Sequence, residues 1–211
     1  MGLFGKKKPE RPPVTVWMKA DYKLKALADV AGTGTRATLV VAHFPETLRR
    51  IEQAFAEKNI AAEVMSLGKI FGLSTFLKEA TARKATLALS DVFPTTASAA
   101  LPEKFSINVA VAELYPVPER DLALQDLFSS FGVSLRYYVA LDDALMKRFG
   151  SDQLIEMLKQ LGGSETDPIE HELLTNSLFK AQEKIKSSAT SDLKSESADE
   201  WFKKNVVEQV K

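Results

Sequence analysis

The sequence predicts an α/β fold in three layers, in which helices cover both faces of a mostly parallel sheet. Short apolar runs rich in β-branched residues alternate with segments whose apolar residues recur at helical spacing throughout residues 14–141. This alternation is typical of parallel strands joined by right-handed helical crossovers. In residues 142–186 only the helical pattern continues. We therefore expect an α/β domain followed by a helical extension.

The first elements are an extended segment and a helix within residues 14–30, which Gly32-Thr-Gly-Thr35 terminates. The apolar run 37–42 suits a strand that is buried on both faces. Pro45 then begins a second helix, because proline fits the first helical turn. The apolar residues of this helix recur at helical spacing: Leu48, Ile51, Ala54 and Phe55.

The same alternation continues from Asn59, which ends this helix, to residue 141. Strands are expected at 61–67, 85–90, 107–111 and 136–141, and helices at 73–83 and 119–128. The helical extension contains candidate helices with plausible caps at 142–149, 152–161 and 168–186.

The last part of the chain, residues 187–211, is expected to hold a linker and a terminal helix. Residues 187–200 are rich in serine and charge, which is typical of a linker. A final segment, residues 199–211, places Phe202, Val206 and Val210 on one helical face beside Trp201. Two interpretations stay open, because this face could contact a protein partner or fold back onto its own domain.

The composition excludes several kinds of site. The chain has no cysteine, so disulfides, thiolate metal sites and cysteine nucleophiles are excluded. Its two histidines, His43 and His171, are too few for a histidine-rich metal site. Lysine plus arginine and aspartate plus glutamate both number 28, so the general basic signature of a nucleic-acid binder is absent. We expect no metal, no cofactor and no nucleic-acid partner.

The N-terminal residues 1–13 are basic and proline-rich, and we expect a disordered tail there. Leu3 and Phe4 precede the lysines at 6–8, which is the opposite of the order in a secretory signal. This order allows weak contact with an anionic membrane surface. No apolar run approaches the roughly 20 residues that span a bilayer. We expect a cytoplasmic protein whose tail leaves room for peripheral contact at the inner membrane face.

One long stretch carries a family resemblance. It begins as Arg136-Tyr-Tyr-Val-Ala-Leu-Asp-Asp-Ala-Leu-Met-Lys-Arg-Phe-Gly150 and continues through Leu161-Gly-Gly, Asp167-Pro-Ile-Glu-His171 and Ala181-Gln-Glu-Lys-Ile185. This stretch resembles the end of the second motor domain of SecA, the protein-translocation ATPase. Upstream, Val16-Trp-Met-Lys-Ala-Asp-Tyr and the later predicted strands are similar to the same domain in the same order, so the resemblance covers roughly residues 14–186.

The resemblance implies a RecA-like fold of the helicase C-terminal-domain type, related to the phosphate-loop NTPases. In that superfamily ATP is hydrolysed between two such domains. The first domain supplies a phosphate loop, and the second supplies arginines that stabilise charge on the transferred phosphoryl group. This sequence contains no Gly-x-x-x-x-Gly-Lys-Ser/Thr. The resemblance therefore implies that the first half of the catalytic site is missing.

The second half of that site has also lost its family residues. The glycine-arginine-glycine turn of the family is replaced by Ser90-Asp-Val-Phe-Pro-Thr-Thr96, and its arginine finger by Leu124-Gln-Asp-Leu-Phe-Ser-Ser-Phe-Gly132. Arg120 and Arg136 are the only arginines from residue 113 to residue 141. They are at best vestigial nucleotide-binding residues, and we expect no catalytic residue.

Three other polar positions have a structural and a functional interpretation. Asp142-Asp143 could hold a metal, but adjacent carboxylates at a helix start more often serve as a cap. His171 could be a general base, but a packing or hydrogen-bonding role is favoured. His43 follows a strand, where α/β sheets bind ligands, but no partner acid or nucleophile is evident in the sequence.

These observations lead to a protein-binding accessory or regulatory factor, connected with preprotein export, that lacks catalysis. Its partner-contact residues would be Trp201, Phe202, Val206 and Val210. The alternative is the second half of a split ATPase, completed by a partner chain that carries the phosphate loop. A nucleic-acid module is the third hypothesis, disfavoured by the neutral net charge.

Overall fold

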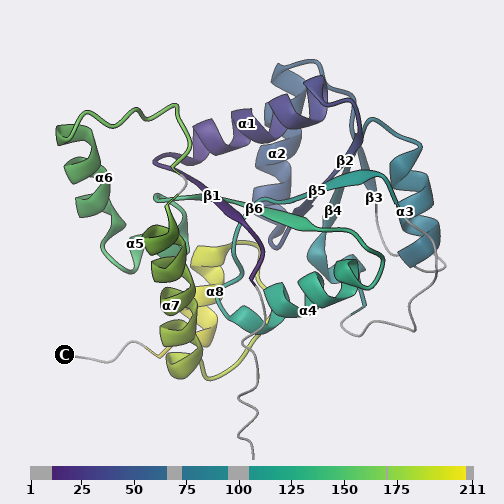
Figure 1. Ribbon diagram of the computed structural model, residues 1–211. Helices are drawn as coiled ribbons and strands as arrows, with labels where there is room; N and C mark the ends of the chain where they lie inside the picture. Colours follow the sequence, from purple (N-terminus) through teal and green to yellow (C-terminus); the bar gives the residue numbers. More distant parts are fainter. Residues whose placement is uncertain (1–10, 66–72, 95–104, 170, 208–211) are drawn as a thin grey trace, which may run out of the picture.

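The computed structural model describes residues 11–65, 73–94, 105–169 and 171–207 (Figure 1). Within these residues six strands form one sheet in the order β1-β6-β5-β2-β4-β3, and every neighbouring pair is parallel. The predicted α/β fold with a parallel sheet is thus confirmed. The strands are β1 (Val14–Trp17), β2 (Ala37–Ala42), β3 (Glu63–Met65), β4 (Ala85–Leu89), β5 (Ile107–Val111) and β6 (Leu135–Ala140).

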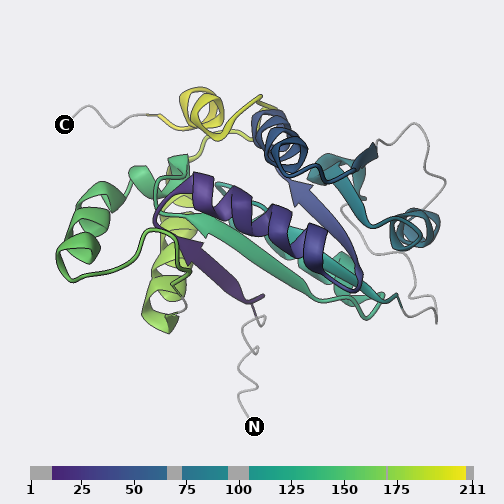
Figure 2. The same ribbon diagram turned by 90° about the horizontal axis from the view of Figure 1, so that it is seen from above.

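Helices cover both faces of the sheet (Figures 1 and 2). One face carries α1 (Ala20–Thr33) and α2 (Pro45–Glu57), and the other carries α3 (Leu73–Thr81) and α4 (Pro118–Ser129). The later helices are α5 (Ala144–Lys147), α6 (Ser151–Gln160), α7 (Glu172–Ser188) and α8 (Ala198–Asn205), and a single 3-10 turn, η2 (Ser90–Val92), follows β4.

The core lies in two layers, one on each side of the sheet. In β2, Leu39 and Val41 pack into the layer beneath α3 and α4, whereas Val40 and Ala42 pack into the layer beneath α1 and α2. All four are fully buried, because successive side chains of a strand point to opposite faces and both faces are covered. Burial on both faces therefore explains why residues 37–42 form a continuous apolar run.

The structure corrects three predicted boundaries. The helix predicted at 168–186 starts only at Glu172, because Ile169 is extended and forms an antiparallel bridge with Val16 of β1. The Ile169 amide donates to the Val16 carbonyl at 2.7 Å, which satisfies part of an exposed sheet edge. The helix predicted at 142–149 is the short α5, and β3 is shorter than the predicted strand 61–67, whose last two residues lie outside the described ones.

The order of the strands creates a switch point between β2 and β5. From β2 the chain moves outward through α2, β3 and α3 to β4, and it then returns to the other side of β2 as β5. The helices α2 and α4, which follow these two strands, lie on opposite faces of the sheet. In open α/β sheets, ligands bind beside the carboxyl ends of the strands at this kind of point.

Candidate functional site

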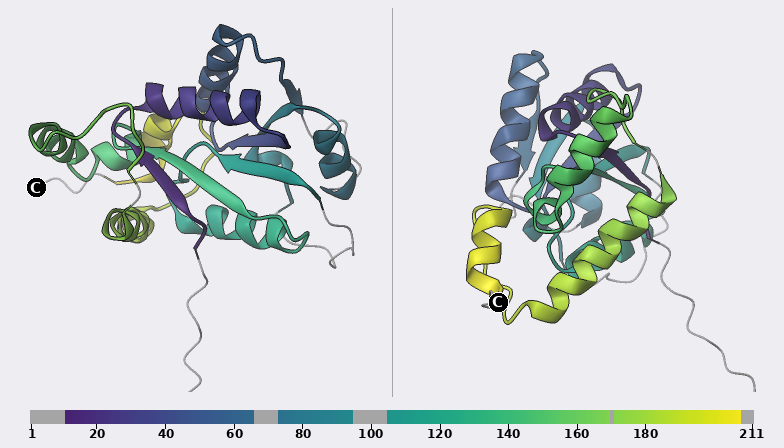
Figure 3. Two further views of the ribbon diagram at one scale, coloured as in Figure 1. Left: turned by 45° about the horizontal axis from the view of Figure 1, so that its top comes forward. Right: turned by 90° about the vertical axis from the view of Figure 1, so that its left-hand side faces the viewer.

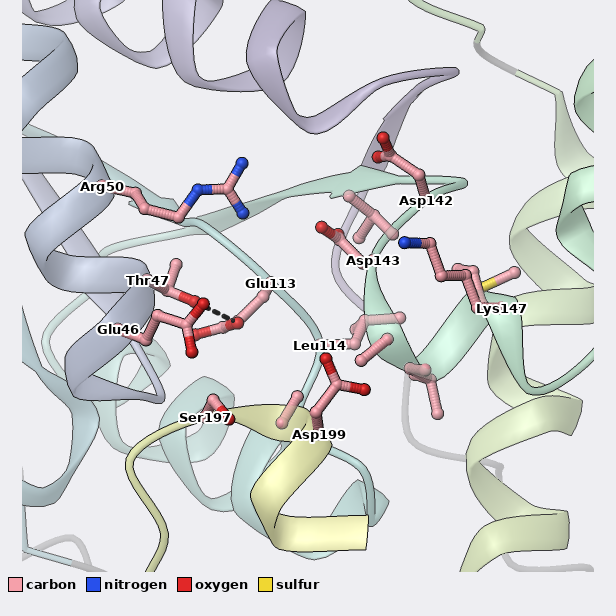
Figure 4. Close-up of a pocket in the computed structure, with 15 residues that line it drawn as sticks. Glu46, Thr47, Arg50, Glu113, Leu114, Asp142, Asp143, Lys147, Ser197 and Asp199 are labelled. Carbon is pink, nitrogen blue, oxygen red and sulfur yellow. Dashed lines mark hydrogen bonds between the residues drawn. The ribbon is translucent and has the colours of Figure 1, made fainter.

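A small pocket lies at the switch point, beside the carboxyl ends of β5 and β6 (Figure 4). Its volume is about 150 Å³, and four parts of the chain meet there: the first turns of α2, the loop after β5, the start of α5 and the start of α8. Its polar lining is mainly acidic, with two cations, and comprises Glu46, Thr47, Arg50, Glu113, Asp142, Asp143, Lys147, Ser197 and Asp199.

The carboxylate of Glu113 occupies the N-terminus of α2. Its Oε1 accepts hydrogen bonds from the backbone amides of His43 at 2.9 Å and Phe44 at 3.1 Å, and its Oε2 accepts one from the Thr47 hydroxyl at 2.7 Å. The Glu46 amide, in the first turn of the helix, donates to the Glu196 carbonyl at 2.9 Å. The first amides of a helix have no partner within the helix and attract anions. Here the chain itself supplies an acceptor for the Glu46 amide and for the His43 and Phe44 amides that lead into the helix.

This arrangement fills a position that suits a phosphate in other α/β proteins. A helix N-terminus at a switch point is a ready-made phosphate site, because its amides point at the ligand and its dipole favours negative charge. Glu113 is only 8% exposed and is bonded through both carboxylate oxygens. A phosphate that approached the same three donors would have to displace this carboxylate.

Burial raises the pKa of Glu113 above its ordinary value. The nearby positive charges of His43 and Lys23 and the hydrogen bond from Thr47 oppose the rise without cancelling it. Desolvation penalises the ionised form of any carboxyl group, whereas donors aimed at the carboxylate favour that form. Burial therefore favours the protonated form of Glu113, the surrounding charges and donors favour the ionised form, and burial has the larger effect.

His43 lies beside this site and has partners on both sides of its ring. Its Nδ1 lies 2.8 Å from the Ser90 hydroxyl, and its Nε2 lies 2.8 Å from Asp121 Oδ1. The other oxygen of Asp121 accepts hydrogen bonds from the Tyr115 amide at 3.1 Å and from Gln182 Nε2 at 2.6 Å. The sequence showed no partner for His43. The structure brings an acid and a hydroxyl to it from 78 and 47 residues away.

Asp142 and Asp143 hold structural positions. Asp142 Oδ1 accepts the Ala20 amide at 2.7 Å, so it caps the start of α1 and not the helix that follows it in sequence. Asp143 pairs with the buried ammonium of Lys23 at 2.8 Å and accepts the Ala140 amide at 2.7 Å. In the described parts of the chain, no group of three or more histidine, aspartate or glutamate side chains is arranged to hold a metal ion.

The structure does not bring Arg120 and Arg136 together. Arg120 lies on α4, where its guanidinium bonds to Asp192 at 2.9 and 3.0 Å and lies over the Tyr115 ring. Arg136 lies at the amino end of β6 and donates to the Thr15 hydroxyl at 3.1 Å. It borders a groove of about 1320 Å³ between β1, α4 and α7, whose wall also includes the exposed His171. The two arginines therefore serve different surfaces.

The C-terminal helix folds back onto its own domain (Figure 3). Trp201 and Phe202 are 0% and 1% exposed, so in this conformation neither is available to a partner. The helix predicted at 199–211 ends at Asn205, and Val206 is extended and bridges to Ala189. Phe202 and Val206 therefore do not share a helical face, and Val210 lies outside the described residues.

Specific polar contacts hold the preceding segment, which the sequence predicted as a linker. Asp192 accepts hydrogen bonds from the Tyr115 hydroxyl, from Trp201 Nε1 at 2.7 Å and from Arg120. Partial burial alone would raise the pKa of Asp192, but these donors outweigh it and lower the pKa. The buried side chain of Asn205 accepts the Leu193 amide at 2.6 Å and donates to the Trp201 carbonyl at 2.9 Å.

Comparison with known proteins identifies one recurring relative. Protein translocase subunit SecA from Acetivibrio thermocellus is 46% identical over 52 residues, which cover 25% of this chain and 6% of that protein. The SecA subunit of Thermus thermophilus is 44% identical over 50 residues, and subunit SecA 1 of Chlorobium chlorochromatii is 47% identical over 49. These matches cover 24% and 23% of this chain and 5% of each relative. No protein-family model matches the chain.

These comparisons confirm the resemblance to SecA for about a quarter of the chain. The similarity points to a protein family that is related to protein translocation. The match spans only about a twentieth of the relatives' length. Among the described residues, none of the helices is both long and apolar enough to cross a membrane.

Proposed function

We propose that this chain is a SecA-like accessory factor of protein translocation that binds a protein partner and does not hydrolyse ATP by itself. The observation that carries this proposal lies at the start of α2, where Glu113 accepts the His43 and Phe44 amides just before the helix and the Glu196 carbonyl accepts the Glu46 amide in its first turn. The similarity to SecA supports the connection with translocation.

The acids at the carboxyl edge add an electrostatic barrier to a nucleotide. Glu46, Glu113, Asp143 and Asp199 all line the pocket of about 150 Å³. A triphosphate placed there would face several carboxylates in a small volume with little water, where like charges repel strongly. Two cations, Arg50 and Lys147, lie on the same lining and Lys23 is paired with Asp143, so the acids still outnumber the cations around the pocket. The edge disfavours the ligand that a SecA-type motor requires.

The side chains that would stabilise the transferred phosphoryl group are also committed elsewhere. Arg120 is held by Asp192 and the Tyr115 ring, and Arg136 lies at the opposite end of the sheet. The positions of the family's arginine finger hold Phe128 and Phe131, which are buried in the core. Phosphoryl transfer depends on positioned cations, so their loss removes most of the catalytic advantage.

We propose the groove between β1, α4 and α7 as the contact surface for a translocase component. Its floor and one wall come from Arg136, His171 and the exposed side of α7, which lie in the stretch 136–185 with the strongest resemblance to SecA. The groove combines apolar residues such as Pro13, Leu122 and Phe179 with a charged rim. Such a mixture is typical of a non-obligate protein interface.

Affinity capture of the tagged chain from its native cell tests this proposal. We expect mass spectrometry to recover translocase subunits with the wild-type chain. Lys180→Glu, which reverses a charge at the groove, should reduce that recovery, whereas Lys203→Glu, an exposed charge on α8, should not. Equal recovery with both variants would exclude the groove. Recovery of no translocase subunit would overturn the proposal, and recovery of a phosphate-loop protein that confers ATP turnover would establish the split-ATPase alternative.

We also propose that the protein is cytoplasmic and that residues 1–13 make weak contact with the inner face of the membrane. Residues 1–10 lie outside the described part of the chain.

A further inference from the structure

We propose that Ser90 is an activated nucleophile that takes an acyl group from small carboxylic esters, with His43 as its base and Asp121 as the group that orients His43. The three residues come from three segments at the carboxyl edge of the sheet: the loop after β2, the 3-10 turn after β4 and the first turn of α4. A hydroxyl, an imidazole and a carboxylate joined by two hydrogen bonds are the parts that activate a serine in unrelated hydrolases. This chemistry is independent of nucleotide and goes beyond the proposed accessory function.

The hydrogen-bond network fixes the direction of proton transfer. Asp121 Oδ2 already accepts the Tyr115 amide and Gln182 Nε2, so the carboxylate is held in place and its Oδ1 faces the ring. With Asp121 as acceptor, His43 Nε2 carries the hydrogen, and in the neutral imidazole that base catalysis requires Nδ1 has a lone pair. The Ser90 hydroxyl, 2.8 Å from Nδ1, is then the donor. Each partner in the chain from serine to carboxylate has the role that base catalysis needs.

The supporting residues His43 and Asp121 are more deeply buried than Ser90, the proposed nucleophile. The His43 side chain is 0% exposed and that of Asp121 is 9% exposed, so water competes little for the bonds between them. Ser90 is half-buried and begins the 3-10 turn directly after β4. Ser90 is thus less deeply buried than the two side chains that support it.

A cavity of about 320 Å³ lies beside the relay and would hold the substrate. His43 lines it, and so do Leu89 and Asp91, the two neighbours of Ser90. This volume lies at the lower end of the range for small-molecule sites. Two cations of the lining are paired with acids, Lys194 with Asp91 and Lys204 with Glu200, so these four side chains add no net charge to the cavity. A short, uncharged acyl ester fits these conditions.

The reaction balances without a further reagent except water. Ser90 Oγ attacks the ester carbonyl while its proton passes to His43 Nδ1. The bond from the carbonyl carbon to the alkoxy oxygen breaks, and the alcohol leaves with that proton. Ser90 then carries the acyl group as an ester, and water releases it as the carboxylic acid.

Labelling with a fluorophosphonate tests the proposal on the full chain. This probe forms a bond from phosphorus to an activated serine oxygen and releases fluoride. We expect one adduct by intact-mass analysis, which peptide mass spectrometry places on Ser90. Ser90→Ala should abolish it, and His43→Gln should slow it by at least about 100-fold, the lower end of a general base's contribution. Ser130→Ala is the matched control, because Ser130 donates only to the Leu127 carbonyl and should label like wild type.

Three results would overturn the inference. They are no adduct on Ser90 of the wild-type chain, equal labelling of the folded chain and of the chain unfolded in concentrated urea, and unchanged labelling of a folded His43→Gln protein. If His43→Gln does not fold, the first two comparisons still decide the outcome, because both use the wild-type chain. A purely structural role for the relay predicts all three results, since it needs no reactivity at Ser90.

Discussion

Glu113 shows how one side chain can decide what an α/β site accepts. Two backbone amides and the Thr47 hydroxyl bind its carboxylate at the start of α2, in the position of a bound anion. The residue lies 70 positions from His43 in sequence, yet parallel pairing of β2 with β5 places the two loops side by side. A tethered carboxylate has no cost of association, so it competes effectively with a free anion for the same donors.

Substitution of Glu113 by glutamine should change the pH dependence of stability. The folded state raises the pKa of Glu113 above its ordinary value of 4.5. Its contribution to the free energy of unfolding is therefore fully present below 4.5 and is lost as the pH rises through the folded pKa. The glutamine that E113Q introduces does not titrate, and its amide group can still accept from the two backbone amides and donate to Thr47.

The difference in free energy of unfolding, E113Q minus wild type, should therefore increase as the pH rises above 4.5, the ordinary pKa of the group. Urea denaturation of both proteins across this range measures it. A difference that stays constant or decreases would show that the buried carboxyl group is not the source of the pH dependence.

At the scale of elements, α8 and the segment before it form part of the domain core. Trp201 packs edge-to-face against Tyr115 and Phe202, and its Nε1 donates to Asp192. The same segment supplies the Glu196 carbonyl that bonds to the start of α2. The terminal helix thus covers the carboxyl edge of the sheet and completes the contacts that fill the site.

Trp201→Ala should destabilise the protein by about 3–5 kcal/mol, the usual cost of removing a large buried aromatic side chain. Leu193→Ala is the matched control in the same segment. Leu193 is 57% exposed, and its backbone bond to Asn205 survives the substitution, so a change within about 0.5 kcal/mol is expected. Denaturant unfolding measures both. Similar small changes for both variants would mean that α8 is a detachable segment after all.

The sequence predicted most of the elements but little of the site, for physical reasons. Strand 37–42 and the helix from Pro45 follow from local periodicity, which the structure retains with Leu48, Ile51 and Phe55 buried. The partners of His43 depend on the order of strands in the sheet, which periodicity does not determine. One signal could have found them, because Ser90 is the last residue of a predicted strand, and His43 and Glu113 follow predicted strands by one and two residues.

In the C-terminal region, too, long-range contacts that local sequence does not predict determine the structure. Serine and charge between residues 187 and 200 are typical of a linker, but their hydrogen bonds reach partners such as Tyr115 and Asn205. Val206 continues the helical apolar pattern of the sequence, yet tertiary pairing with Ala189 overrides it. Local composition cannot report such contacts.

At the scale of the whole molecule, the two ends of the sheet differ in character. The carboxyl end is closed by Glu113, by the acids of the small pocket and by α8. The amino end opens into the groove of about 1320 Å³ beside β1 and α7. A SecA-type motor would use the first end for nucleotide. Here the larger concave surface lies at the second end, which supports a protein-binding role.

The most direct test is the melting temperature of the isolated chain with and without saturating magnesium ATP. A ligand at 100 times its dissociation constant stabilises the folded state by about 2.7 kcal/mol, which is readily detected as a rise in melting temperature. We expect no change, because Glu113 already accepts the His43 and Phe44 amides just before α2 and the Glu196 carbonyl accepts the Glu46 amide in its first turn. A melting temperature that rises with ATP concentration and saturates would contradict the account.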